Sequence, residues 1–389
     1  MKRICVLTAT RAEYGLLKPV IVKLNAVPDL DVKIAVTGMH LSPEFGFTYK
    51  EIEKDNLIID KKIEILLSSD SPASVSKSMG LAMIGFADYF DEIHPDMLLV
   101  LGDRYETLAV CCAAMNARIP IAHMYGGETT EGAVDESIRH AITKMSYLHF
   151  TSTEEYRKRV IQLGEDPDRV FTVGAVGIEN IMNTRLMPPD ELSEFLGMPL
   201  SEPYAVVTFH PVTLEDNTVE EQFSQLLKAC DNHPQLRYIF TKANADANGR
   251  IINRMIDDYV RTHKNAVAFA SLGTVRYLSA LKYASLVIGN SSSGLIEAPS
   301  FHIPTVNIGD RQKGRLMAES VISCEPTADA ITDAISKALS DEFRKKIQTV
   351  KNPYGEGNTS DKIVNTLLDY LLNKKINLKK KFYNIRFDI

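Results

Sequence analysis

The sequence lacks the usual features of membrane proteins, secreted proteins and nucleic-acid-binding proteins. Its five cysteines are an odd number without a CxxC pair, which is typical of buried free thiols in a reducing compartment. No stretch approaches the ~20 apolar residues of a transmembrane helix, and the apolar run before Arg11 is too short for a signal peptide. A net charge of -6 gives no general attraction to nucleic acid or anionic lipid. We therefore expect a cytoplasmic protein.

Several cofactor motifs are also missing. No GxGxxG follows the first apolar run, and no GxxxxGK[ST] occurs anywhere, so neither NAD nor ATP is indicated. His123, His140 and His149 lack metal-ligand spacing and are interpreted as structural. The sequence predicts no cofactor and no metal.

The chain does contain a repeated succession of apolar strand, polar turn and helix. Strands are expected at residues 4–8, 32–36, 97–101, 119–122 and 148–151, and again at 205–209, 238–241, 286–288 and 305–308. Such alternation predicts parallel sheets with helices on both faces. Because 389 residues exceed the roughly 250–300 that one core supports, we expect two α/β domains with a cleft between them. The proline-rich stretch 187–203 is the expected connection.

One loop of the second half has the composition of an anion site. Gly289-Asn290-Ser291-Ser292-Ser293-Gly294 follows an apolar strand and precedes a helical pattern. Unpaired N–H groups and serine hydroxyls at a helix start favour a phosphate, although an ordinary serine cap explains the loop equally well. The positive charges of Arg311, Lys313 and Arg315, after the next strand, favour the anion site and predict a diphosphate there.

Carboxylates follow the strands of the first half. Asp103 and Glu106 come after residues 97–101, and Glu128, Glu131, Asp135 and Glu136 come after 119–122. Like charges at close range raise at least one pKa, so this rim is a candidate acid–base site. Glu106 and Glu136 could instead be ordinary helix N-terminal acids. Asp103, directly after an apolar strand, is the stronger candidate.

These residues resemble a known family, the hydrolysing UDP-N-acetylglucosamine 2-epimerases of bacterial sialic-acid synthesis. The similarity runs in order through most of the chain: Arg11–Gly15, Val36–His40, Leu101–Glu106, Gly126–Glu128, Asp135–His140, Phe209–Pro211, Gly289–Glu297 and Asn307–Gly314. The resemblance implies the GT-B fold, with two Rossmann-like domains facing across a cleft. We expect domains at 1–183, completed by a C-terminal helix at 361–389, and at 184–360. A homodimer or homotetramer is the family's expectation.

The resemblance also implies a two-step reaction without a cofactor. A base removes the C2 proton of the sugar while UDP leaves C1, and water then adds to the 2-acetamidoglucal to give N-acetylmannosamine. Carried over residue by residue, the catalytic candidates are Asp103, Glu128, Asp135 and His210. The substrate-binding candidates are Arg11, His40, Arg104, Asn244, Ser291, Ser292, Ser293, Glu297 and Arg311.

The sequence departs from the family at one position. Many members have glutamate where this chain has Tyr125, which makes Glu128 the available substitute and leaves the base of the hydration step open. His210, before a proline at a strand end, could also be purely structural. The alternatives are a hydrolysing epimerase of a UDP-2,4-diacetamido-2,4,6-trideoxyhexose from the legionaminic-acid pathway, a non-hydrolysing 2-epimerase, a GT-B glycosyltransferase and a UDP-sugar sensor.

Overall fold

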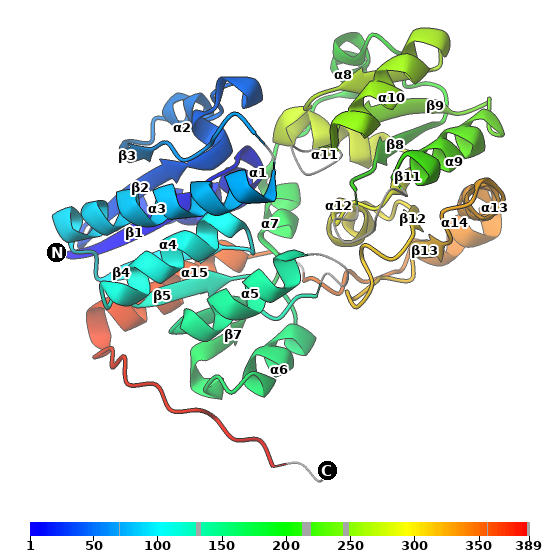
Figure 1. Cartoon of the computed structure of the whole chain (residues 1–389). Helices are drawn as coiled ribbons and strands as arrows, with labels where there is room; N and C mark the ends of the chain where they lie inside the picture. The colour runs from blue at the N-terminus through cyan, green and yellow to red at the C-terminus, as the bar shows by residue number, and fades with distance from the viewer. Residues whose placement is uncertain (70, 130–133, 212–218, 244–248, 356, 387–389) are drawn as a thin grey trace. The chain divides into compact units, whose positions relative to one another are not determined.

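The structure is a computed structural model that describes the chain except residues 70, 130–133, 212–218, 244–248, 356 and 387–389 (Figure 1). It divides into two compact units. The first comprises Met1–Glu128, Asp135–Asn180 and Gly355–Ile389, and the second Ile181–Tyr354 together with Thr129–Val134. Within the described residues, no helix combines the length and the hydropathy needed to cross a membrane.

The first unit is built on a parallel sheet of seven strands in the order β3-β2-β1-β4-β5-β6-β7. The strands are β1 (Lys2–Thr8), β2 (Leu30–Thr37), β3 (Ile59–Ile63), β4 (Met97–Leu101), β5 (Ile121–Met124), β6 (Leu148–Thr151) and β7 (Val170–Thr172). Its helices include α1 (Arg11–Asn25), α2 (Tyr49–Lys54), α3 (Pro72–Ile93), α4 (Tyr105–Asn116), α5 (Val134–Met145), α6 (Glu154–Gln162) and α7 (Val176–Asn183).

The second unit repeats this plan with a parallel sheet of six strands in the order β10-β9-β8-β11-β12-β13. The strands are β8 (Tyr204–Thr208), β9 (Arg237–Thr241), β10 (Ala266–Phe269), β11 (Leu286–Gly289), β12 (Thr305–Ile308) and β13 (Val321–Cys324). Its helices include α8 (Pro189–Leu196), α9 (Val219–Asp231), α10 (Gly249–Thr262), α11 (Gly273–Tyr283), α12 (Ser293–Ile296), α13 (Ala328–Leu339) and α14 (Asp341–Ile347). The predicted α/β class with two Rossmann-like sheets is confirmed.

The apolar runs form central strands because helices cover both faces of each sheet. Every residue of β4 and of β8 is buried, and separate apolar clusters lie on the two faces of the first sheet. A strand buried on both faces needs continuous rather than alternating hydrophobicity. All strands of each sheet run in one direction, so the polar turns that follow them share one edge.

The end of the chain returns to the first unit through α15 (Thr359–Leu368), which packs beside α1 (Figure 1). The buried Glu179 of α7 holds this helix by accepting the Ser360 N–H at 2.6 Å, and its other oxygen lies 3.3 Å from the Lys23 ammonium. The predicted helix at 361–389 is wrong for residues 374–386, which follow the π-helical turn η5 (Asp369–Asn373) and form no helix. Five lysines between 374 and 381 repel one another there, which disfavours further helix.

Candidate functional site

Asp103 lies where β4 ends, in the turn that leads into α4. Its carboxylate forms an ion pair with the guanidinium of Arg139, which is 1% exposed and comes from α5. Arg139 also donates to Glu136 at 3.0 Å and to the Glu128 carbonyl at 2.8 Å. A buried arginine thus joins the acids of two successive turns. As the sequence predicted, Asp103 and Glu136 lie together at one edge of the sheet.

A second pair of carboxyl groups, Glu13 and Glu106, is buried at the same edge of the sheet. Arg104 donates to Glu106 Oε1 at 2.7 Å, and Glu13 Oε2 accepts the N–H groups of Ala9 and Thr10 at 2.7 and 3.2 Å. Glu13 Oε1 and Glu106 Oε2 have no hydrogen-bond partner among the described residues. Burial raises the pKa of Glu13 to about 7, and the nearby Glu106 adds to the rise. This edge therefore holds a carboxyl group that can exchange a proton near neutral pH.

The acids after β5 have different surroundings. Glu128 is 5% exposed, and its Oε1 accepts the Ser152 hydroxyl at 2.8 Å. Asp135 lies partly exposed in the first turn of α5. Tyr125, at the position of the family's glutamate, has a positive φ of 68°, and its hydroxyl accepts the Val176 N–H at 2.9 Å. Tyr125 therefore caps the start of α7 with its hydroxyl.

The two candidates nearest the N-terminus lie around the first strand. Arg11 is the first residue of α1, whose start is stabilised by the capping box that Thr10 and Glu13 form. His40 is fully buried, with Nε2 3.0 Å from Thr8 Oγ1 and Nδ1 2.8 Å from Thr48 Oγ1. Burial lowers the pKa of His40 to about 4, so the ring is neutral at pH 7. Both ring nitrogens thus have hydroxyl partners from the protein.

The serine loop of the second unit begins at a position that only glycine can occupy. Gly289 has φ 133°, and a Cβ there would lie 1.9 Å from the Thr208 carbonyl oxygen. The next residue, Asn290, fixes the loop by accepting the His210 N–H at 2.7 Å and donating to the His210 carbonyl at 2.8 Å. The loop after β11 and the turn after β8 are therefore one rigid group.

The three serines lie partly exposed after this turn, but the predicted helix behind them is short. Ser293 begins α12, which has only four residues before the 3-10 turn η4 (Ala298–Phe301). A helix of this length has a small dipole. Its N-terminus therefore contributes less to phosphate binding than the sequence predicted. Polar groups remain: Ser293 N donates to Ser291 Oγ at 3.3 Å, and Tyr277 donates its hydroxyl to Ser293 at 2.7 Å.

His210 and Glu297 each have a buried polar atom without a partner among the described residues, Nδ1 and Oε2 respectively. Burial lowers the pKa of His210 to about 3, with Arg311 adding to the effect, and raises the pKa of Glu297 to about 7. The histidine is therefore neutral at pH 7. Since an unpaired buried polar atom costs free energy, both atoms are suited to a polar ligand.

The turn after β12 contributes positive charge to this edge, as the sequence predicted for neighbouring strands. Arg311 Nη1 and Gln312 Nε2 donate to the Asn290 carbonyl at 3.0 and 2.8 Å. Arg315 donates from Nε to the Thr129 carbonyl at 3.0 Å. Asn244 lies outside the described residues.

Sequence reasoning missed four residues of these two groups: Glu13, Arg139, Tyr277 and Gln312. Glu13, Arg139 and Gln312 stand inside stretches that carried the family resemblance, so the signal was available for all three. Tyr277 on α11 gave no signal, because its contact with the serine loop comes from a separate element.

The family model described as UDP-N-acetylglucosamine 2-epimerase matches residues 22–368. A Campylobacter jejuni relative, "GDP/UDP-N,N'-diacetylbacillosamine 2-epimerase (hydrolyzing)", is 45% identical, with 97% of this chain and 96% of the relative covered. "Polysialic acid biosynthesis protein P7" of Escherichia coli is 41% identical, with 99% and 98% covered. A Legionella pneumophila relative, "UDP-N,N'-diacetylbacillosamine 2-epimerase (hydrolyzing)", is 35% identical, with 97% and 98% covered.

Solved structures support the fold. The UDP-GlcNAc 2-epimerase from Neisseria meningitidis bound to UDP-GlcNAc superposes with a TM-score of 0.81 at 20% identity, covering 95% of this chain and 100% of that one. These similarities extend over nearly the whole chain. The chain belongs to the UDP-N-acetylglucosamine 2-epimerase family.

Proposed function

We propose that this protein is a hydrolysing 2-epimerase of a UDP-2-acetamido sugar. The observation that carries the proposal is the group at the carboxyl edge of the first sheet, where the buried Arg139 holds Asp103 and Glu136 together. In the first step a base takes the C2 proton, the C1–O bond breaks, and UDP leaves with that electron pair. In the second step water adds its oxygen to C1 of the resulting glucal, and C2 receives a proton on the opposite face. The products are a free 2-acetamido-mannose-type sugar and UDP.

In this reaction the first unit carries out the acid–base steps. Asp103 is the base for C2, because it is partly exposed and held in a fixed orientation by Arg139. Glu128 and Asp135 are the candidates for the hydration step, since Tyr125 is committed to the start of α7. A positioned base contributes about 10²–10⁴-fold to the rate of such a reaction.

The second unit binds the UDP group of the substrate. Ser291, Ser292 and Arg311 supply hydrogen-bond donors and charge for the diphosphate, which stabilises UDP as it leaves. Neutral His210 can donate to the same group without the cost of a buried charge. Glu297 offers its buried oxygen to a hydroxyl of the ribose.

The first candidate substrate is UDP-N-acetylglucosamine, giving N-acetylmannosamine for sialic-acid synthesis in the cytoplasm. It is favoured by the family description and by the polysialic-acid protein at 41% identity. The second candidate is UDP-2,4-diacetamido-2,4,6-trideoxyglucose, favoured by the relatives at 45% and 35% identity that are named for diacetylbacillosamine. The two differ at C4 and C6 of the sugar, and the proposed chemistry at C1 and C2 is the same for both.

The test is incubation with each UDP-sugar separately in D₂O, followed by proton NMR. Free UDP together with a C2-deuterated 2-acetamido-mannose product supports the proposal, and the ratio of kcat/KM for the two sugars identifies the substrate. Intact epimerised UDP-sugar would show a non-hydrolysing enzyme instead. No turnover of either sugar without an acceptor would favour a glycosyltransferase, and tight binding without turnover would favour a sensor.

A further inference from the structure

A cavity of about 480 Å³ lies at the edge of the first sheet opposite the candidate catalytic residues. Tyr147 directly precedes β6 and Arg169 directly precedes β7, so both line the cavity from the amino ends of their strands. Asp103 follows the carboxyl end of β4 in the same parallel sheet. The cavity is therefore separate from the proposed reaction site. Tyr370 and the segment after Asn373 complete its wall.

The cavity is strongly basic in a protein whose net charge is -6. One carboxylate lines the cavity, that of Asp166. Five cationic side chains also line it: Arg169, Lys374, Lys375, Lys379 and Lys381. Lys374 is engaged with Asp369 at 2.7 Å and lies over the Tyr370 ring at 4.1 Å. The other three lysines are exposed on the tail segment. Such a concentration of one charge favours a small anion with several negative charges.

Arg169 makes this cavity different from a chance group of surface lysines. The residue is 9% exposed, and its Nε is buried without a hydrogen-bond partner among the described residues. Its guanidinium lies over the Tyr147 ring, 4.9 Å from the centroid, and its Nη2 is 4.0 Å from Asp166. This nearly buried guanidinium places a fixed positive charge in the cavity wall, which favours an anionic ligand.

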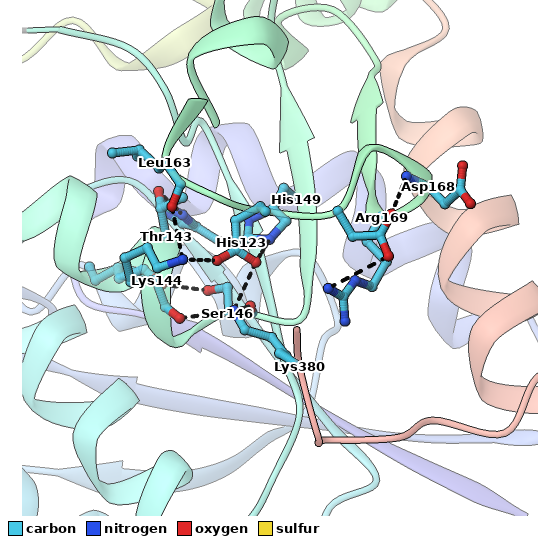
Figure 2. Close-up of polar contacts among 12 residues, drawn as sticks. His123, Thr143, Lys144, Ser146, His149, Leu163, Asp168, Arg169 and Lys380 are labelled. Carbon is cyan, nitrogen blue, oxygen red and sulfur yellow. Dashed lines mark hydrogen bonds and ion pairs between the residues drawn. The ribbon is translucent and has the colours of Figure 1, made fainter. Parts of the chain in front are cut away.

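The tail that forms one wall is fixed to the first unit by Lys380. Its ammonium donates to the carbonyls of Lys144 and Ser146 at 2.9 and 2.6 Å and to the buried Glu165 carboxylate at 2.8 Å. Lys144 and His149 lie 2.6 and 3.1 Å from the oxygens of the same carboxylate. Figure 2 shows the side chains of Lys144, His149 and Lys380 pointing toward one another. Beyond Lys380, Tyr383 N donates to the Gly164 carbonyl at 2.9 Å. The cavity thus has a wall held at defined points.

We propose that this cavity binds a small phosphorylated molecule, with Arg169 and the tail lysines Lys375, Lys379 and Lys381 holding its phosphate groups. Both tyrosine rings have a cation over them, so recognition rests on charge and hydrogen bonds rather than on stacking of an aromatic base. The site is distinct from the proposed substrate site, and its occupation does not depend on the proposed reaction.

The experiment uses the full chain with a fluorescent reporter in the cavity. The protein contains no tryptophan, so Asn377→Trp, at an exposed lining position, introduces its only indole. Inorganic pyrophosphate is titrated against this variant while indole fluorescence is followed. A saturable change that weakens with added salt is expected, because exposed charges are screened.

Two further variants and a matched control are made in the reporter background. The combination Lys375→Gln, Lys379→Gln and Lys381→Gln is expected to weaken the affinity about tenfold or more, as is Arg169→Gln. The control combination Lys77→Gln, Lys228→Gln and Lys337→Gln removes the same charge from exposed positions elsewhere and is expected to leave the affinity within about twofold.

Three results would overturn the proposal. The first is no saturable response to pyrophosphate in the reporter variant, and the second is an equal response in the lysine combination and its control. The third is a fluorescence change with phosphatidylserine vesicles but none with pyrophosphate, which would make the tail a membrane contact. Because each readout is binding at the cavity, a failure here is independent of the outcome of the D₂O experiment.

Discussion

At the scale of single residues, the chemistry depends on which carboxyl groups carry charge. Asp103 shares an ion pair with the buried Arg139, whereas Glu13 is buried near Glu106, and burial raises the pKa of Glu13 to about 7. Two acids at one edge of the sheet thus have opposite surroundings. Such a division is common in acid–base sites, where one group gives up a proton and another keeps it.

Asp103→Asn is expected to reduce C2 deuterium exchange by roughly 10²–10⁴-fold while UDP affinity stays within a few-fold. The amide keeps the size of the side chain and an oxygen for Arg139, but it cannot accept a proton. NMR in D₂O measures the exchange, and calorimetry measures UDP binding. Glu220→Gln, at an exposed position of α9, is the control and should behave as wild type. Exchange at the wild-type rate in Asp103→Asn would remove Asp103 from the mechanism.

Glu13→Gln is expected to change how stability depends on pH. Because the folded-state pKa of Glu13 is raised to about 7, the folded state binds more protons than the unfolded state between about pH 4.5 and 7. This group therefore lowers the free energy of unfolding as pH rises through that window, by roughly 3 kcal/mol in all. The amide has no proton to lose.

Urea unfolding at pH 5 and pH 8 measures this effect as a difference between variant and wild type. The stability of Glu13→Gln relative to wild type should improve toward pH 8. Comparison with wild type is needed because other buried groups also make stability depend on pH. Glu297, whose pKa is raised to about 7, lowers stability as pH rises, as Glu13 does. His123 and His210, whose pKa values burial lowers to about 3, have the opposite effect. A relative stability that is the same at both pH values would contradict the assignment.

At the scale of elements, the turns after the strands decide where functional atoms lie. Asn290 holds the serine loop to the turn after β8, and that contact is possible only because Gly289 lets the two backbones approach. The glycine was visible in the sequence, whereas the pairing of β11 with β12 was only a condition of the predicted anion site and comes from the structure. The shortness of α12 was visible as well, because Pro299 marks the end of the helical pattern in the sequence.

Gly289→Ala is expected to destabilise the protein by about 3 kcal/mol or more and to weaken UDP binding, because its methyl group would lie 1.9 Å from a backbone oxygen. Gly80→Ala is the matched control, with no atom within 4 Å of the added Cβ and a position inside α3. That change should stabilise by roughly 0.5–1 kcal/mol. Thermal unfolding and UDP titration compare the two. Equal stability of both variants would show that the loop can move.

At the scale of the whole molecule, the chain crosses to the second unit and returns, and the returning segment is secured to the first unit as far as Tyr383. Glu179 fixes α15, and Glu165 fixes the tail through Lys380. Burial lowers the pKa of Lys380, and the Glu165 carboxylate opposes that effect. Neither contact could be predicted from sequence, because each partner is more than 180 positions away along the chain.

Lys380→Gln is expected to lower the free energy of unfolding by about 1–3 kcal/mol, since the buried Glu165 loses one of its cations and keeps Lys144. The neighbouring Lys381→Gln, at an exposed position, should change it by less than about 0.5 kcal/mol. Urea unfolding monitored by circular dichroism makes the comparison. The same stability for both variants would mean that the tail is not held by this contact.

The α/β class and the polar turns after nine strands could be predicted from the sequence, because continuous apolar runs and glycines act locally. The edge strands β3, β7, β10 and β13 were not predicted, and neither was the end of the last helix. In β3, three charged residues lie between Ile59 and Ile63, so this strand lacks the continuous apolar run of a central strand. The pairing of Arg139 with Asp103, the burial that raises the pKa of Glu13 to about 7, and the pairing of Lys380 with Glu165 came only from the tertiary structure. Ion pairing and desolvation depend on distance in space, and neither can be read from separation along the chain.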